Sequence, residues 1–145
     1  MDETILTTFD DSLNRCNAIP EFLDRFYEKF LESSPKVREK FNGTDFVKQK
    51  RALRASLHLL LIAAQDEKRD PERYLRDVAA SHDRAHMNIT SELYDLWLDS
   101  LLDTVRECDP QFSPDVEKAW ERVMMQGIHY MLSEREKSGA RITVT

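Results

Sequence analysis

The sequence predicts an all-α fold, and two observations support this prediction. Apolar residues recur three and four positions apart in every long segment, which places them on one face of a helix, and no segment alternates like a strand. The chain holds only 3 glycines among 145 residues, too few for a turn-rich all-β protein. With 41% hydrophobic and 33% charged residues, the composition is typical of a globular protein, and we expect one domain over residues 1–145.

Prolines predict where the helices begin. Four of them stand where a first helical turn would start, because the missing N–H is no loss there and a preceding Ser or Asp can cap the helix. These four are Pro20, Pro35, Pro71 and Pro114. Pro110 instead follows Cys108 and Asp109 and is expected to end a helix. The predicted helices span roughly residues 3–16, 20–33, 35–41, 45–65, 71–86, 91–108 and 114–136.

Three of these helices carry the clearest apolar stripes, and such faces must pack on one another. In 45–65 the stripe is Phe46, Leu53, Leu57, Leu60 and Leu61. In 91–108 it is Leu93, Trp97, Leu98, Leu101 and Val105. In 114–136 it is Val116, Trp120, Val123, Met124, Gly127, Ile128 and Met131.

Charge and cysteine usage exclude several classes of function. A net charge of -6 argues against nonspecific nucleic-acid binding, which needs a basic surface. The longest apolar run, residues 59–64, is too short to cross a bilayer, and the acidic N-terminus lacks the pattern of a secretory signal. Cys16 and Cys108 form no CxxC pair and have no neighbours in sequence that would activate a thiol, so we interpret them as reduced thiols. We therefore expect a cytoplasmic protein without nucleic-acid or membrane partners.

The predicted helix 71–86 places a histidine on its apolar face. Leu75, Val78, Ala79 and His82 share one face, and His86 follows one turn later. Neutral imidazole is a good ligand for haem iron, but a core histidine bonded to a backbone carbonyl fits the same stripe, and the stripe alone favours it. No CxxCH motif is present, which excludes covalent haem attachment, and no set of residues has zinc spacing.

Two stretches, residues 80–89 and 93–98, resemble the proximal region of bacterial globins. In that family the iron-binding histidine ends one helix, and a tyrosine about three turns of chain later opens the next helix and packs against it. His82 and Tyr94 match these two positions. The distal half of the family is resembled by residues 26–31, 34–37, 40–41 and 49–53. The resemblance spans about residues 20–132 and implies a globin fold of about seven helices around a haem pocket.

The resemblance also implies roles for single residues. His82 would bind the iron of haem b, and Phe41 would stack on the porphyrin. Gln49 and Leu53 would lie above the iron, and Tyr27 would point its hydroxyl at a bound ligand. Without the resemblance we would interpret Gln49 as a solvated helix residue, and Phe41 and Tyr27 as ordinary core aromatics. Further residues expected to line the cofactor are Lys50, Val78, Met87, Tyr94 and Leu98.

Two departures from flavohaemoglobin-like members bear on these roles. The spacing from His82 to Tyr94 is about two residues longer, so His86 is the alternative iron ligand. Those members also carry a glutamate on the last helix that is linked to the tyrosine. The matching position here falls near Arg135, which argues against a strong electron push onto the iron.

The function that follows is reversible binding of O2, and of CO and NO, at a His-ligated iron. The first alternative is an NO dioxygenase or peroxidase-type haem enzyme, which would need a separate reductase as a partner. The second is a haem-free globin-fold signalling module. A homodimer is also compatible with the sequence. An internal sixth iron ligand would have to come from Tyr27, Gln49 or Lys50.

Overall fold

The computed structural model describes residues 1–65 and 90–144, with the backbone alone for 134–144. These residues form six helices and no strand, which confirms the all-α prediction. The helices are α1 (Glu3–Asn17), α2 (Phe22–Ser33), α3 (Pro35–Lys40), α4 (Phe46–Gln65), α6 (Ser91–Cys108) and α7 (Pro114–Val144). The predicted helix 71–86 lies outside the described residues. None of the helices in the described ranges is long and apolar enough to span a membrane.

Side-chain caps fix the beginnings of several helices. Ser34 accepts a hydrogen bond from the Lys36 N–H at 3.2 Å, and Pro35 occupies the first turn of α3, as its sequence predicts. Ser113 caps α7 in the same way, by accepting from the Val116 N–H at 3.2 Å ahead of Pro114. These two starts therefore follow from local chemistry rather than from tertiary packing.

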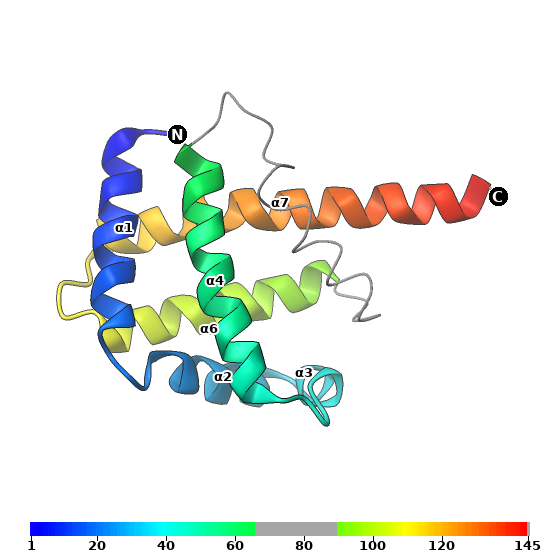
Figure 1. The fold of residues 1–145 in the computed structure, drawn as a ribbon, viewed down its shortest axis with the longest axis horizontal. Coiled ribbons are helices and arrows are strands. Elements are labelled where there is room, and N and C mark those ends of the chain that lie inside the picture. The colour runs from blue at the N-terminus through cyan, green and yellow to red at the C-terminus, as the bar shows by residue number, and fades with distance from the viewer. Residues whose placement is uncertain (66–89, 145) are drawn as a thin grey trace.

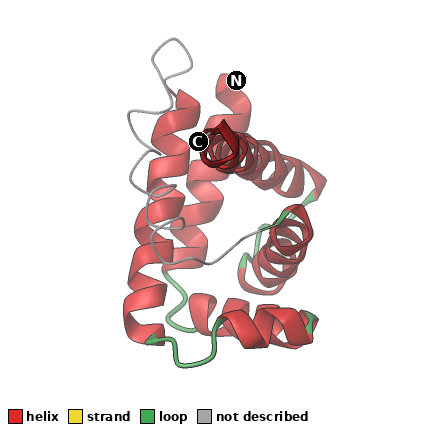
Figure 2. Cartoon of the chain, turned by 90° about the vertical axis from the view of Figure 1, so that its right-hand side faces the viewer, coloured by secondary structure: helices red, strands yellow, loops and turns green. Residues whose placement is uncertain are grey.

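The helices form two layers that cross at a steep angle. Figure 1 shows α1 and α4 side by side in one layer, and α6 and α7 running across them in the other. Figure 2, turned by 90°, shows α6 and α7 nearly end-on beside the α1 and α4 layer. Helix α2 packs along α6, and α3 packs against α2. The C-terminal part of α7 extends well beyond the other helices.

One cluster of buried apolar side chains lies between these layers. Its centre is Trp120 on α7, which is fully buried and packs edge-on against Phe9 of α1 with the ring centroids 4.8 Å apart. The predicted apolar side chains of the α4 and α7 stripes belong to this cluster, with Phe46 packed against its edge, and Gly127 is buried as well. On α6 the stripe is buried except at Trp97, which is partly exposed and meets Phe26 edge-on at 6.1 Å.

Gly127 of α7 faces Leu60 where α4 and α7 are in contact. A Cβ atom built on this glycine would overlap Cδ2 of Leu60 on α4. Since Leu60 is itself buried, its side chain has little room to move away. The absence of a side chain at position 127 therefore allows the observed spacing of the two helices.

A buried polar network joins α1 to the segment between α6 and α7. The Asp109 carboxylate accepts hydrogen bonds from Ser12 Oγ at 2.6 Å and from Arg15 Nε and Nη2 at 2.7 and 2.9 Å. The Gln111 N–H adds a fourth bond at 2.8 Å. Trp120 Nε1 donates to Ser12 Oγ at 2.9 Å, so the network continues into α7. Every polar group named here has a partner, as buried polar groups require.

Two helix ends differ from the prediction by more than one residue. Helix α2 begins at Phe22 rather than at residue 20, because Pro20 lies in the turn that follows α1 instead of inside the first turn of α2. Helix α7 continues to Val144, eight residues past the predicted end at 136. No proline interrupts residues 134–144, and a single glycine at 139 disfavours a helix by only about 1 kcal/mol.

The two cysteines agree with their interpretation as reduced thiols. Cys16 and Cys108 are free and buried. Burial raises the pKa of the Cys16 thiol to about 12, and it also raises the pKa of Cys108, so neither thiol is activated. His58 and His129 are exposed.

Candidate functional site

A tight turn between α3 and α4 places two phenylalanines next to each other. Phe41 follows the last residue of α3, and the Thr44 N–H closes a turn by donating to the Phe41 carbonyl at 3.1 Å. Gly43 has φ +77°, a left-handed conformation that glycine adopts without strain. Asp45 then caps α4 by accepting from the Val47 N–H at 3.1 Å. The chain therefore reverses between Phe41 and Phe46, which brings both rings to the same corner.

These rings join three aromatic residues of α2, and we call the group the aromatic corner. Its members are Phe26, Tyr27, Phe30, Phe41 and Phe46. Phe41 and Phe46 stack with an interplanar angle of 28° and centroids 6.2 Å apart. The Tyr27 ring meets Phe46 edge-on at 5.4 Å and Phe41 edge-on at 6.1 Å. The corner thus presents flat apolar surfaces that exclude water.

Tyr27 places one hydroxyl inside this apolar corner. The residue is only 4% exposed, and a side-chain hydrogen bond joins its hydroxyl to Gln49 on α4. Burial raises the pKa of Tyr27 to about 12, although the bond with Gln49 acts in the opposite direction. The phenol therefore stays protonated at physiological pH and can donate a hydrogen bond. Among the described residues, Gln49 is the one that gives this hydroxyl a hydrogen bond.

The other expected cofactor-lining residues of the described segments lie on α4 and α6. Leu53 is buried on α4 one turn after Gln49, and Leu98 is buried on α6. Tyr94 is partly buried and packs against the core near the start of α6. Four residues named for the opposite side of the site, Val78, His82, His86 and Met87, lie outside the described residues. The structure therefore gathers Tyr27, Phe41 and Gln49, and their roles stay predictions.

Lys50 lies at the site but meets a partner that the sequence did not suggest. Its ammonium forms an ion pair with the Asp24 carboxylate of α2, and both side chains are partly exposed. Phe46 was expected only as a core residue of α4, yet it contacts both Phe41 and Tyr27. The only sequence signal for Phe46 was its place in the apolar stripe, and that stripe does not distinguish a site residue from a core residue.

The described residues of this site fit one side of a haem. Its walls are aromatic and aliphatic, which suits a flat apolar macrocycle, and Tyr27 and Gln49 form a polar pair among them. Within the described ranges, no group of three His, Cys, Asp or Glu could hold a metal ion. The expected iron ligand, His82, lies outside these ranges.

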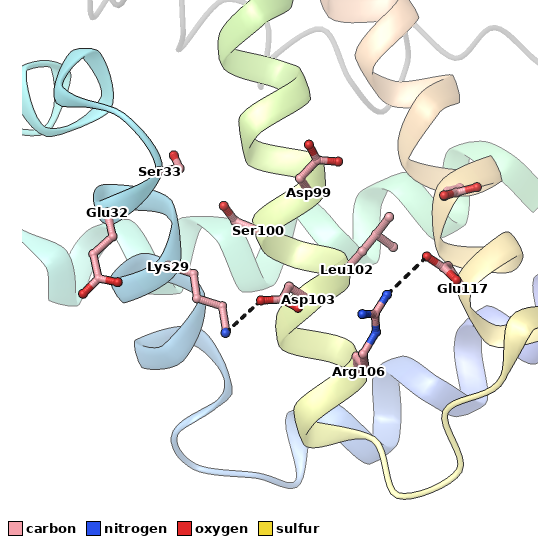
Figure 3. Close-up of a pocket in the computed structure, with 10 residues that line it drawn as sticks. Lys29, Glu32, Ser33, Asp99, Ser100, Leu102, Asp103, Arg106 and Glu117 are labelled. Carbon is pink, nitrogen blue, oxygen red and sulfur yellow. Dashed lines mark hydrogen bonds and ion pairs between the residues drawn. The ribbon is translucent and has the colours of Figure 1, made fainter.

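A separate surface groove of about 560 Å³ lies between α2, α6 and α7 (Figure 3). Most of the side chains that line it are charged, and ion pairs join Lys29 to Asp103 at 2.9 Å and Arg106 to Glu117 at 3.7 Å. Lys29 is two residues from Tyr27 and therefore points to a different side of α2. This charged groove does not suit an apolar cofactor, so the aromatic corner is the better candidate.

Comparison with known proteins agrees with this geometry. Residues 24–131 match the family model described as Globin. A solved structure of a protein from Pseudomonas aeruginosa PAO1, described as structurally highly homologous to a human haemoglobin, is 41% identical in sequence. That alignment covers 89% of this chain and 96% of the other, with a TM-score of 0.82. No curated protein matches the sequence. The family model covers most of the chain and includes α3, α4 and α6 entirely, so the chain belongs to the globin family.

Proposed function

We propose that this globin binds haem b through His82 and that it reversibly binds O2, and also CO and NO, at the haem iron. The bound haem would supply the site at which a diatomic ligand attaches. The observation that carries the proposal is the buried Tyr27 hydroxyl, which lies beside Gln49 inside the aromatic corner. A polar pair in such apolar surroundings is what selective binding of a small polar ligand requires.

The residues of this chain would have two roles, contact with the macrocycle and hydrogen bonding to the ligand. Phe41 and Leu53 would contact the macrocycle and keep water away from it. Tyr27, which its raised pKa keeps protonated, would donate a hydrogen bond to the ligand. Each such bond contributes about 0.5–1.5 kcal/mol, so the pair with Gln49 would slow ligand release roughly tenfold or more.

Absorption spectroscopy of the purified protein tests the proposal. We expect a Soret band that shifts on reduction with dithionite and again when CO is added. His82→Ala should abolish the band, and His86→Ala should leave it in place. A Soret band that survives in His82→Ala but disappears in His86→Ala would transfer the iron ligand to His86. A colourless protein that takes up no added haemin would favour a haem-free globin-fold module instead.

A second candidate function is NO dioxygenation with electrons from a separate reductase. The contact between Tyr27 and Gln49 favours it, because two donors beside a bound ligand would retain oxygen until NO arrives. A single rapid loss of bound oxygen on adding NO would not distinguish this enzyme from a binding protein. Sustained NO consumption with NADH and a reductase would support the enzyme, and a single turnover would support the binding protein.

A further inference from the structure

Asp24 and Lys50 form an ion pair directly beside the polar pair of the site. Asp24 lies one turn before Tyr27 on α2, and Lys50 follows Gln49 on α4. The Asp24 carboxylate contacts the Lys50 ammonium, and their side chains are 50% and 33% exposed. The ion pair therefore connects α2 to α4 at the solvent-facing margin of the aromatic corner.

The same face of α4 carries the other contacts with α2. Phe46 and Lys50 are four residues apart, and Phe46 and Gln49 are three apart, so all three project to one side of the helix. Phe46 meets the Tyr27 ring at 5.4 Å, and Gln49 bonds to the Tyr27 hydroxyl. Side chains rather than close backbone packing thus hold the N-terminal half of α4 to α2.

We propose that the Asp24–Lys50 ion pair is a positioning element that holds α4 against α2, keeps Gln49 on the Tyr27 hydroxyl and limits access to the site from solvent. This role differs from contact between Lys50 and the cofactor, because Lys50 acts through Asp24. The part of the proposal that concerns ligand entry rests on the proposed gas-binding function, whereas the part that concerns Tyr27 and Gln49 does not.

The expected size of the effect follows from the exposure of the pair. Partly exposed ion pairs are weak and are screened by salt, so breaking this one should change opening of the site by about two- to fivefold. Because the pair lies at the margin and not in the core, its loss should leave the fold intact. The effect should therefore appear in ligand association rates and not in overall folding.

Flash photolysis of the CO complex provides the first test. Asp24→Asn and Lys50→Met should each raise the CO association rate about two- to fivefold at low salt. Added salt should raise the CO association rate of the parent toward that of the single variants, and it should leave the rates of the variants unchanged. The charge-reversed double variant Asp24→Lys/Lys50→Asp should return to the parent rate. The control variant Lys48→Met removes the same charge from an exposed site on α4, and its CO association rate should equal that of the parent.

The second test needs no haem. In protein labelled with ¹³Cζ-tyrosine, the Tyr27 signal is identified by its loss in Tyr27→Phe. We expect this signal to shift in both single variants and to return in the charge-reversed double variant, because it reports the bond with Gln49. Single variants with parent-like rates and an unmoved Tyr27 signal would overturn the proposal, and so would a double variant that behaves like the singles. A chain that takes up no haem would overturn the gas-binding function, and the Tyr27 signal would still decide the role of the ion pair.

Discussion

Two buried polar side chains in this molecule have opposite surroundings. Asp109 accepts four hydrogen bonds, and the residues that donate them are Ser12, Arg15 and Gln111. The Tyr27 hydroxyl lies among aromatic rings, and Gln49 is its one hydrogen-bond partner among the described residues. A hydroxyl has one donor and two acceptor positions, so Tyr27 retains capacity that Asp109 has used. The comparison separates a carboxylate whose hydrogen bonds join distant segments from a hydroxyl that keeps hydrogen-bonding capacity.

The largest effect should come from removing the carboxylate of the satisfied network. Asp109→Ala leaves Arg15 and Ser12 without their buried acceptor and should lower the free energy of unfolding by about 3 kcal/mol. Urea unfolding would measure this loss, and the CO spectrum of the folded variant should not change. Asp103→Ala removes an exposed partner of Lys29 and serves as the control, with an expected loss below about 1 kcal/mol. Equal losses in the two variants would show that the network around Asp109 has no special role.

Alkaline pH should weaken the Tyr27 region selectively. The pKa of Tyr27 is raised from 10.0 in the unfolded chain to about 12 in the folded one. Its contribution is therefore complete below pH 10 and is lost as the pH rises toward 12. The loss amounts to roughly 2–3 kcal/mol over that window. The difference between parent and Tyr27→Phe unfolding curves from pH 9 to pH 11 isolates this residue, and parallel curves would contradict the prediction.

A smaller free-energy effect is expected on the rate at which oxygen dissociates from Tyr27→Phe. Tyr27→Phe removes one hydrogen-bond donor and keeps the ring, so the oxygen dissociation rate should rise about fivefold, which corresponds to ~1 kcal/mol. Stability at pH 7 should change by less than that amount. Stopped-flow mixing of the oxygenated protein with CO measures the rate. Coincident traces for parent and variant would show that Tyr27 donates nothing to the ligand.

The smallest effect should be seen in acid. Burial raises the pKa of Asp109, but hydrogen bonds from Arg15, Ser12 and the Gln111 N–H outweigh it, so the pKa is lowered from 3.8. The stability that this carboxylate contributes is present above its ordinary pKa and is lost as the pH falls through the lower folded value. The stability difference between the parent and Asp109→Asn should therefore shrink below pH 3.8. Acid unfolding followed by circular dichroism would measure it, and a constant difference would contradict it.

Local chemistry and helical periodicity account for the parts of the fold that sequence predicted well. Ser34 with Pro35 and Ser113 with Pro114 fix the starts of α3 and α7 through bonds within a few residues. The apolar stripe of α7 predicts which of its residues are buried, because a helix presents every third or fourth residue to the same neighbour. A proline does not predict the start of a helix correctly where it belongs to the preceding turn, as Pro20 does.

The features that sequence did not predict join residues distant in the chain. Asp109 bonds to Ser12 and Arg15, which are 97 and 94 positions away, and its neighbour Pro110 suggested only the end of a helix. Asp24 and Lys50 carry ordinary surface charges, so nothing in either segment indicates their ion pair. Tyr27, Phe41 and Gln49 were grouped through the family resemblance, since each alone fits an ordinary helix position.

Gly127 determines how close α4 can lie to α7, although it is distant from Tyr27 in the sequence. Where the two helices cross (Figure 1), a methyl group would occupy the space that Leu60 already fills. An alanine here would force either the Leu60 side chain or α4 itself to shift, and α4 also carries Gln49 and Leu53. A position with no side chain of its own thus influences, from the far end of α4, where Gln49 and Leu53 lie.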